Sequence, residues 1–133
     1  MLSLFRRSSP AVEPVGMMTI EPMRFSDVPI VSRIEEDSFE DPWPHQAFDH
    51  AITDSRQRAC VVRENGTIVG YAVVHVSAES HQITNLAVVR EYRRRGIASK
   101  IVGHLQLLLG QKPFMCLYAE VRESNLSAQL LFK

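Results

Sequence analysis

This sequence of 133 residues has few of the features that mark several common protein classes. Its two cysteines, Cys60 and Cys116, lack C-x-x-C spacing, which excludes a disulfide-stapled scaffold and predicts two buried thiols in a reducing compartment, the cytoplasm. Basic and acidic residues balance at 15 each, so no general attraction to nucleic acid or a membrane surface is expected. No apolar run approaches the roughly 20 residues that span a bilayer. One globular domain is expected.

Motifs of metal and nucleotide sites are missing too. The histidines include His45 and His50, which are neighbours without ligand spacing, and no H-E-x-x-H occurs, so no metal site is expected. No G-x-G-x-x-G and no Gly-Lys-Ser/Thr loop is present. Cys116 has no histidine nearby to activate it, which disfavours a thiol nucleophile.

Apolar periodicity and turn residues predict alternating strands and helices. Helices are expected from Ser26, as N-cap, to about residue 38, through residues 47–52, from 97 to near Gly110 with a stripe of Ile97, Ile101, Leu105 and Leu108, and from Ser124 onward. Strands are expected at 18–24, 59–63, 67–76, 82–88 and 114–121, with a hairpin at Asn65-Gly66.

The two ends of the chain differ from its centre. Residues 1–17 contain prolines and two arginines without a repeating pattern, and predict a flexible N-terminal extension with Met17 or Met18 as an alternative start. The chain stops at Lys133 inside an expected helix, without a capping signal. Residues 18–133 are therefore predicted to form a domain that lacks its last strands.

The most informative segment is residues 85–99, which read NLAVVREYRRRGIAS. An apolar strand leads into a basic turn with one glycine, and an amphipathic helix follows. A helix N-terminus carries free N–H groups and partial positive charge, so this turn suits a phosphate. A solvated charge run is the weaker interpretation, because arginines at the positive end of a helix are unfavourable without a nearby anion. A nucleic-acid patch is disfavoured by the neutral remainder of the chain.

A carboxylate, Glu120, stands near the end of the last apolar strand. Burial there would raise its pKa toward that of a useful general base. An ion pair with Arg122 or with an arginine of the basic turn is an equal alternative on residue type alone. Asn125, considered by itself, is typical of a helix cap.

These segments resemble those of one enzyme family. Arg93-x-x-Gly96-x-Ala98 is similar to the acyl-coenzyme-A signature of GNAT N-acetyltransferases. The run from Glu120 to Asn125, EVRESN, resembles the ribosomal-protein-alanine N-acetyltransferase (RimI-type) branch of that family. The segment from Phe39 to Trp43 is similar to a Phe-Pro-Trp region after that branch's first helix.

The resemblance implies a set of site residues. The cofactor-binding set would be Leu86, Ala87 and Val88 through their backbone, Arg94, Arg95, Gly96, Ile97, Ala98 and Ser99 around the pyrophosphate, and Asn125. Glu120 would be the general base. Phe132 stands where the family places a tyrosine as general acid. Phe39 and Trp43 would contact the acceptor substrate, although Trp43 could instead cap the core.

The expected fold is therefore the GNAT-like α/β fold of acyl-CoA N-acyltransferases, with a mixed, mostly antiparallel sheet that splays between residues 82–88 and 114–121 to admit acetyl-CoA. The expected activity is acetyl transfer from acetyl-CoA to a protein N-terminal α-amine, such as the N-terminal alanine of a ribosomal protein. Two alternatives remain open: a GNAT enzyme acting on a small-molecule amine or a lysine, and a catalytically weak acetyl-CoA-binding remnant. The expected partners are acetyl-CoA and a protein or peptide N-terminus, with no nucleic acid, membrane or metal.

Overall fold

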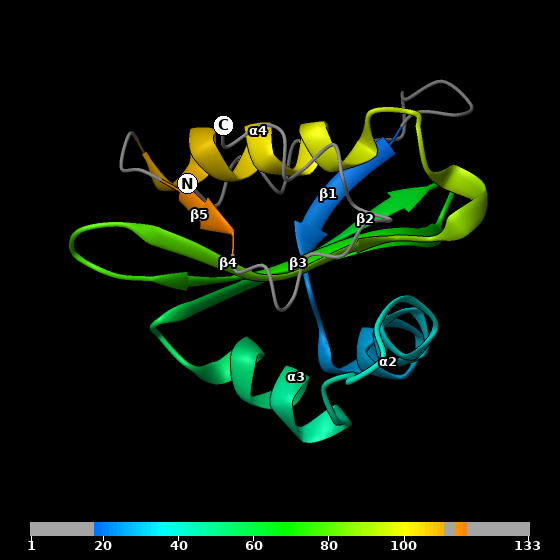
Figure 1. The fold of residues 1–133 in the computed structure, drawn as a ribbon, viewed down its shortest axis with the longest axis horizontal. Helices are drawn as coiled ribbons and strands as arrows, with labels where there is room; N and C mark the ends of the chain where they lie inside the picture. Colours follow the sequence, from blue (N-terminus) through cyan, green and yellow to red (C-terminus); the bar gives the residue numbers. More distant parts are fainter. Residues whose placement is uncertain (1–17, 111–113, 117–133) are drawn as a thin grey trace.

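The computed structural model of this protein describes residues 18–110 and 114–116 (Figure 1). The predicted N-terminal extension and most of the segment after residue 110 lie outside the described residues. The elements follow in the order β1 (Met18–Pro22), η1 (Phe25–Asp27), α2 (Val28–Ser38), α3 (His45–Thr53), β2 (Gln57–Glu64), β3 (Thr67–Val76), β4 (His81–Val88), η2 (Arg90–Tyr92), α4 (Ile97–Leu109) and β5 (Phe114–Cys116).

The strands form one sheet in the order β1-β2-β3-β4-β5. The first four strands pair antiparallel with their neighbours, whereas β4 and β5 pair in parallel. The predicted hairpin between β2 and β3 is confirmed: Asn65 and Gly66 have φ values of 53° and 85°, as a tight two-residue turn of this hand requires. The predicted mixed, mostly antiparallel sheet is thus present in the described residues.

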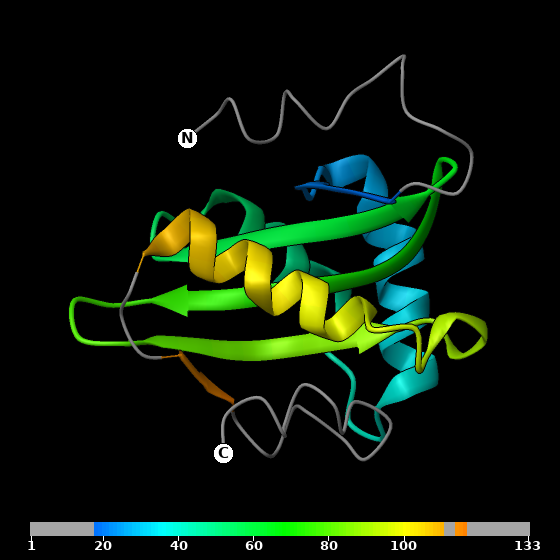
Figure 2. The ribbon, with the colours of Figure 1, turned by 90° about the horizontal axis from the view of Figure 1, so that it is seen from above.

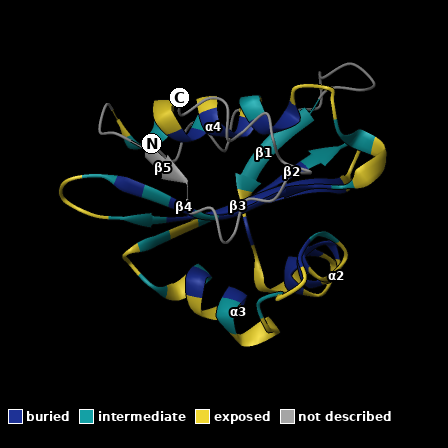
Figure 3. Ribbon diagram, in the orientation of Figure 1, coloured by how far each residue is buried: buried dark blue, intermediate teal, exposed yellow. Residues whose placement is uncertain are grey.

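Helices cover both faces of the sheet. In Figures 1 and 2, α4 crosses one face, and α2 and α3 lie on the other. The expected stripe on α4 is largely confirmed, since Ile97, Ile101 and Leu105 are buried while Leu108 is only half-buried. A separate apolar cluster, which includes Phe48 and Tyr71, packs α2 and α3 against the opposite face. The buried residues in Figure 3 accordingly line the two interfaces between helices and sheet.

The start of α2 differs from the sequence prediction. Ser26 is not the N-cap; it lies inside the short helix η1, and Asp27 takes the N-cap position of α2. The Asp27 carboxylate accepts a hydrogen bond from the Arg24 backbone N–H at 2.9 Å and another from the Arg63 guanidinium at 2.7 Å. These two bonds hold Asp27 at the end of η1, so α2 begins after Ser26.

Candidate functional site

β4 is distorted just after the three residues that pair with the described part of β5. Among the described residues, β5 pairs with β4 only from His81 to Ile83. Immediately afterwards the register with β3 slips: Ile83 is opposite Val74 and Asn85 is opposite Val73, so Thr84 is an extra residue on β4. A bulge of this kind bends a strand and increases its local twist. The bend lies where the splay was expected, although residues 117–121 of the expected partner strand are outside the described residues.

The backbone of Val88 points toward the edge of β4 that lies away from β3. The Val89 N–H donates to the Val69 carbonyl of β3 at 2.8 Å. Because successive N–H groups of a strand point to opposite edges, the Val88 N–H faces the other way. The Val88 carbonyl also faces that edge, where it accepts a hydrogen bond from Arg93 Nε at 2.7 Å. The end of β4 thus presents a backbone donor on the edge that faces away from β3.

The basic turn holds its backbone in an unusual conformation. Arg94 and Gly96 have φ values of 66° and 78°, both in the left-handed region, and Gly96 is the N-cap of α4 without a side-chain cap. The N–H groups of residues 94–99 donate to no other described residue. Consecutive free N–H groups around left-handed residues at a helix N-terminus form a concave anion site.

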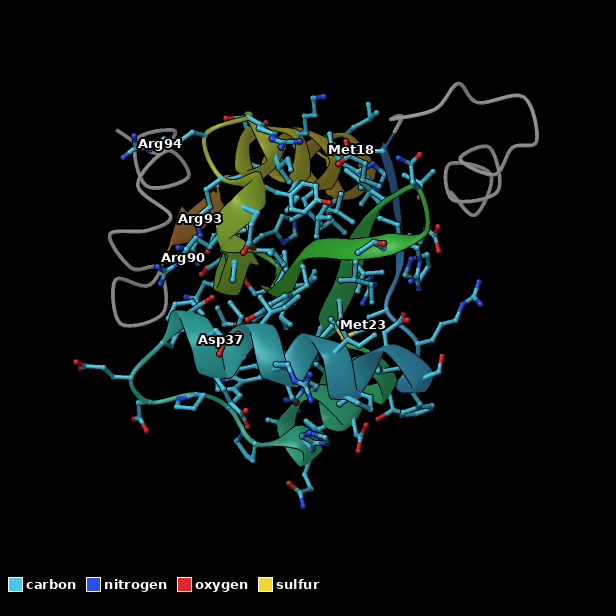
Figure 4. All side chains as sticks on the ribbon, turned by 90° about the vertical axis from the view of Figure 1, so that its right-hand side faces the viewer. Met18, Met23, Asp37, Arg90, Arg93 and Arg94 are labelled. Carbon is cyan, nitrogen blue, oxygen red and sulfur yellow. The ribbon has the colours of Figure 1, made fainter. Side chains whose placement is uncertain are left out.

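The arginines of this turn are not equivalent. Arg93 is tied down, because it donates to Val88 and, at 3.4 Å, to Ser38 Oγ on α2. Burial, together with the positive charge of Arg90, lowers the pKa of the Arg93 guanidinium below its usual value. Arg95 stacks over the Tyr92 ring at 4.8 Å. Figure 4 shows Arg94 apart from Arg90 and Arg93, toward the α4 side of the turn.

Arg95 also lies 3.8 Å from the Glu64 carboxylate, and its side chain is 55% exposed. This contact is loose and largely open to solvent, so it contributes little to stability. Arg94 and Arg95 therefore both carry charge that remains accessible to an anion beside the free N–H groups. The turn fits a pyrophosphate in its donors and in its charge.

A hollow of about 450 Å³ lies on the opposite side of the sheet from α4. It is lined by residues from the loop before α3, from α3 itself and from the ends of β2, β3 and β4: Trp43, Ala47, His50, Gln57, His75, Gln82 and Thr84. Trp43 is half-buried, and its ring lies 5.3 Å from that of Phe48. None of the described residues that line it carries a carboxylate, so this part of the hollow offers amide, hydroxyl, imidazole and apolar groups.

The sequence model of the Acetyltransferase (GNAT) family matches residues 28–133. The chain belongs to this family. The predicted GNAT fold is thereby confirmed, and the chain is an acetyltransferase of GNAT type that uses acetyl-CoA as donor. The helices of the described residues include none that is long and apolar enough to cross a membrane.

The relatives of this GNAT protein include bacterial proteins that are named ribosomal-protein-alanine N-acetyltransferases. A putative [ribosomal protein bS18]-alanine N-acetyltransferase of Bacillus subtilis is 32% identical over 112 residues, covering 84% of this chain and 74% of the relative. The [ribosomal protein bS18]-alanine N-acetyltransferase of Escherichia coli K12 is 27% identical over 117 residues, which cover 88% of this chain and 78% of the relative. The crystal structure of the Escherichia coli ribosomal-protein-S18-alanine N-acetyltransferase matches with a TM-score of 0.63 and 26% identity. That match covers 70% of this chain and 59% of the crystallised one.

The structure brings together one half of the predicted GNAT site. Leu86, Ala87 and Val88 end β4, and Gly96, Ile97, Ala98 and Ser99 begin α4, with the turn between them. Glu120, Asn125 and Phe132 lie outside the described residues, so their roles stay predictions. Phe39 is only 6% exposed and packs in the core between α2, α3 and the sheet, which leaves it little surface for a substrate. Among the described residues, no group of three His, Cys, Asp or Glu side chains could hold a metal.

A buried polar cluster around Glu35 was not predicted from the sequence. Glu35 of α2 is fully buried and accepts hydrogen bonds from Tyr71, Asn85 and the backbone of Trp43. Glu35 is followed by two further acidic residues, so composition alone suggests a solvated helix face. The available signal was the helical period: Val28, Val31 and Ile34 define the buried face, and residue 35 lies on it as the next i+4 position from Val31.

Gly70 of β3 lies close to the backbone at the end of β4. A Cβ atom built on Gly70 would lie 3.0 Å from the Ala87 carbonyl oxygen and 3.7 Å from Ile101 of α4. We expect Gly70→Ala to displace the Ala87–Val88 backbone, to destabilise the fold by about 1–2 kcal/mol, and to weaken acetyl-CoA binding. Chemical denaturation and calorimetric titration with acetyl-CoA measure the two effects.

The matched control for this substitution is Gly103→Ala on the exposed side of α4, where an added Cβ meets nothing within 4 Å. There alanine should stabilise the helix by about 0.5–1 kcal/mol and leave acetyl-CoA affinity unchanged. If Gly70→Ala behaved like Gly103→Ala, the close approach of β3 to the end of β4 would have no functional consequence.

Proposed function

We propose that this protein transfers the acetyl group of acetyl-CoA to the α-amine at the N-terminus of another protein, with the N-terminal alanine of a ribosomal protein as its acceptor. The observation that carries the proposal is the run of N–H groups from Arg94 to Ser99 that donate to no other described residue, together with the Val88 N–H that faces away from β3. The N–H groups of residues 94–99 suit a pyrophosphate, and the Val88 N–H suits a thioester oxygen. The acceptor class rests on the similarity to bS18-alanine N-acetyltransferases.

Binding would use the backbone more than side chains. The N–H groups of residues 94–99 would hold the pyrophosphate, with Arg94 and Arg95 adding accessible charge and Asn125 contributing a polar side chain. Leu86 and Ala87 would align the pantetheine arm along the edge of β4. Contacts made far from the reacting atoms position the thioester, which lowers the entropic part of the barrier.

The transfer would be direct, without an acyl-enzyme. An α-amine has a pKa near about 8 and is mostly an ammonium ion at neutral pH. Glu120 would accept its proton, directly or through water. The amine nitrogen would then attack the thioester carbon, the Val88 N–H would stabilise the developing oxyanion, and the C–S bond would break.

The departing thiolate would take its proton from solvent. Phe132 stands where the family has a tyrosine, and a phenyl ring carries no transferable proton. A free thiol has a pKa near about 8.5, so a donor accelerates this step without being indispensable at neutral pH. Tyr118, two residues before Glu120, is a less favoured donor.

The hollow beside Trp43 is the proposed acceptor side of the site. It lies on the α2–α3 side of the sheet and reaches β4 at Gln82 and Thr84, next to the bend. A polycationic small molecule would require carboxylates, and the described residues that line this hollow include none. A peptide backbone and an aromatic or small side chain are better matched to Trp43, Gln57 and Thr84.

The deciding experiment combines calorimetry with acetyl-CoA and a turnover assay on three acceptors. These are a peptide with a free N-terminal alanine, the same peptide with a blocked α-amine and an internal lysine, and an aminoglycoside. We expect acetyl-CoA binding and turnover on the first peptide alone. Turnover only on the lysine peptide or the aminoglycoside would contradict the acceptor class, and binding without any turnover would identify a remnant that has lost catalysis.

A further inference from the structure

Glu35 is a buried carboxylate that bonds only to hydrogen-bond donors. Its Oε1 accepts from the Tyr71 hydroxyl and from Asn85 Nδ2 at 3.3 Å. Its Oε2 accepts from Asn85 Nδ2 at 3.1 Å and from the Trp43 backbone N–H at 3.0 Å. All three partners can donate, so both carboxyl oxygens of Glu35 have hydrogen-bond partners.

Glu35 forms no salt bridge with any residue that the structure describes. Burying a carboxyl group without a counter-ion is costly, and an apolar side chain of similar size would often fill the same space at no loss of stability. Core stability alone therefore gives a poor account of this residue. The groups that Glu35 connects give a better account of why it is there.

The three donors come from three different parts of the fold. Tyr71 is on β3 and Asn85 is on β4, directly before Leu86, whereas Trp43 is in the loop between α2 and α3. Through Glu35, this loop is hydrogen-bonded to β4, the strand whose last residues would present their backbone to the acetyl group in the proposed function. The same loop carries the tryptophan that lines the hollow.

We propose that Glu35 is a positioning residue of the acceptor side: it fixes the Trp43 loop relative to β4, and so sets the affinity for the acceptor without affecting that for acetyl-CoA. This inference rests on the proposed function in placing the acceptor at the hollow. Glu35 touches neither substrate. Its effect is carried by the Trp43 backbone N–H, a bond that a side-chain substitution at Trp43 would not remove.

The test uses Glu35→Gln, which keeps the shape of the side chain but replaces one acceptor oxygen by an NH₂ donor that would face Tyr71, Asn85 or Trp43. Trp43 is the chain's single tryptophan, so its fluorescence reports on the loop directly. We expect quenching of Trp43 by acrylamide to rise about twofold, the KM for the N-terminal alanine peptide to rise about tenfold, and acetyl-CoA affinity to stay within about twofold.

Glu36→Gln is the matched control, because Glu36 is the next residue on α2 and is exposed. It should leave all three quantities unchanged. If Glu35→Gln fails to fold, Tyr71→Phe removes one donor without disturbing ring packing, and should raise the same peptide KM by a smaller factor.

Two results would overturn the proposal: unchanged Trp43 quenching in the folded variant, or an equal loss of affinity for acetyl-CoA and for the peptide. Failure of the proposed function is a separate outcome. If the wild-type protein does not acetylate the peptide, the acceptor class is wrong, while Trp43 quenching still decides whether Glu35 fixes the loop.

Discussion

Gly96→Val should abolish acetyl-CoA binding while the protein remains folded. Gly96 has a φ of 78°, in the left-handed region that a β-branched residue strongly disfavours, so valine would drive the turn toward another conformation. The turn that carries the N–H groups of residues 94–99 would then lose its left-handed conformation at Gly96. We expect at least a hundredfold loss of acetyl-CoA affinity, measured by calorimetry.

The fold should survive this substitution for a local reason. A Cβ atom on Gly96 meets no other atom within 4 Å, so the damage is limited to backbone strain of about 1–2 kcal/mol. That is a fraction of the stability of a typical domain.

Gly66→Val is the matched control. Gly66 has a similar φ of 85° and equally open surroundings, but it lies in the hairpin between β2 and β3. The control should lose comparable stability and keep its acetyl-CoA affinity. Wild-type affinity in Gly96→Val, or equal losses in both variants, would refute the turn as the pyrophosphate anchor.

The elements that could be predicted from the sequence are those set by local chemistry. Asn65-Gly66 dictates a tight hairpin turn, and a strand, a basic turn and an amphipathic helix in succession determine where an anion can bind. Both appear in the structure where the residue pattern placed them. Such features depend on neighbours in the chain, which a single sequence displays.

The features that could not be predicted from the sequence depend on residues far apart in the chain. Nothing around Thr84 marks it as a bulge, because the extra residue is defined only against its partner Val73–Val74 on β3. The bonds of Glu35 span 36 residues to Tyr71 and 50 to Asn85. Likewise, the hydrogen bonds from Arg93 to Val88 and Ser38 depend on tertiary geometry, whereas the sequence indicated only that Arg93 belongs to a basic turn with an acyl-coenzyme-A signature.

Glu120→Gln should lower the turnover rate at neutral pH by about 10²–10⁴-fold and leave acetyl-CoA affinity nearly intact. Glutamine keeps the size and polarity of the side chain but cannot accept the amine proton. Steady-state kinetics with the N-terminal alanine peptide, together with calorimetry, measure the two quantities. Glu123→Gln, a carboxylate three residues further along, is the control and should change turnover by no more than a few-fold.

The pH dependence of this defect identifies its cause. Below a pH of about 8 the acceptor is mostly ammonium and needs a base, whereas above it the amine is already free. The deficit of Glu120→Gln in kcat/KM should therefore shrink as the pH rises through that value. A deficit of constant size would mean that Glu120 does not act as the base, and a variant that unfolds would instead assign Glu120 to a structural ion pair with Arg122 or the basic turn.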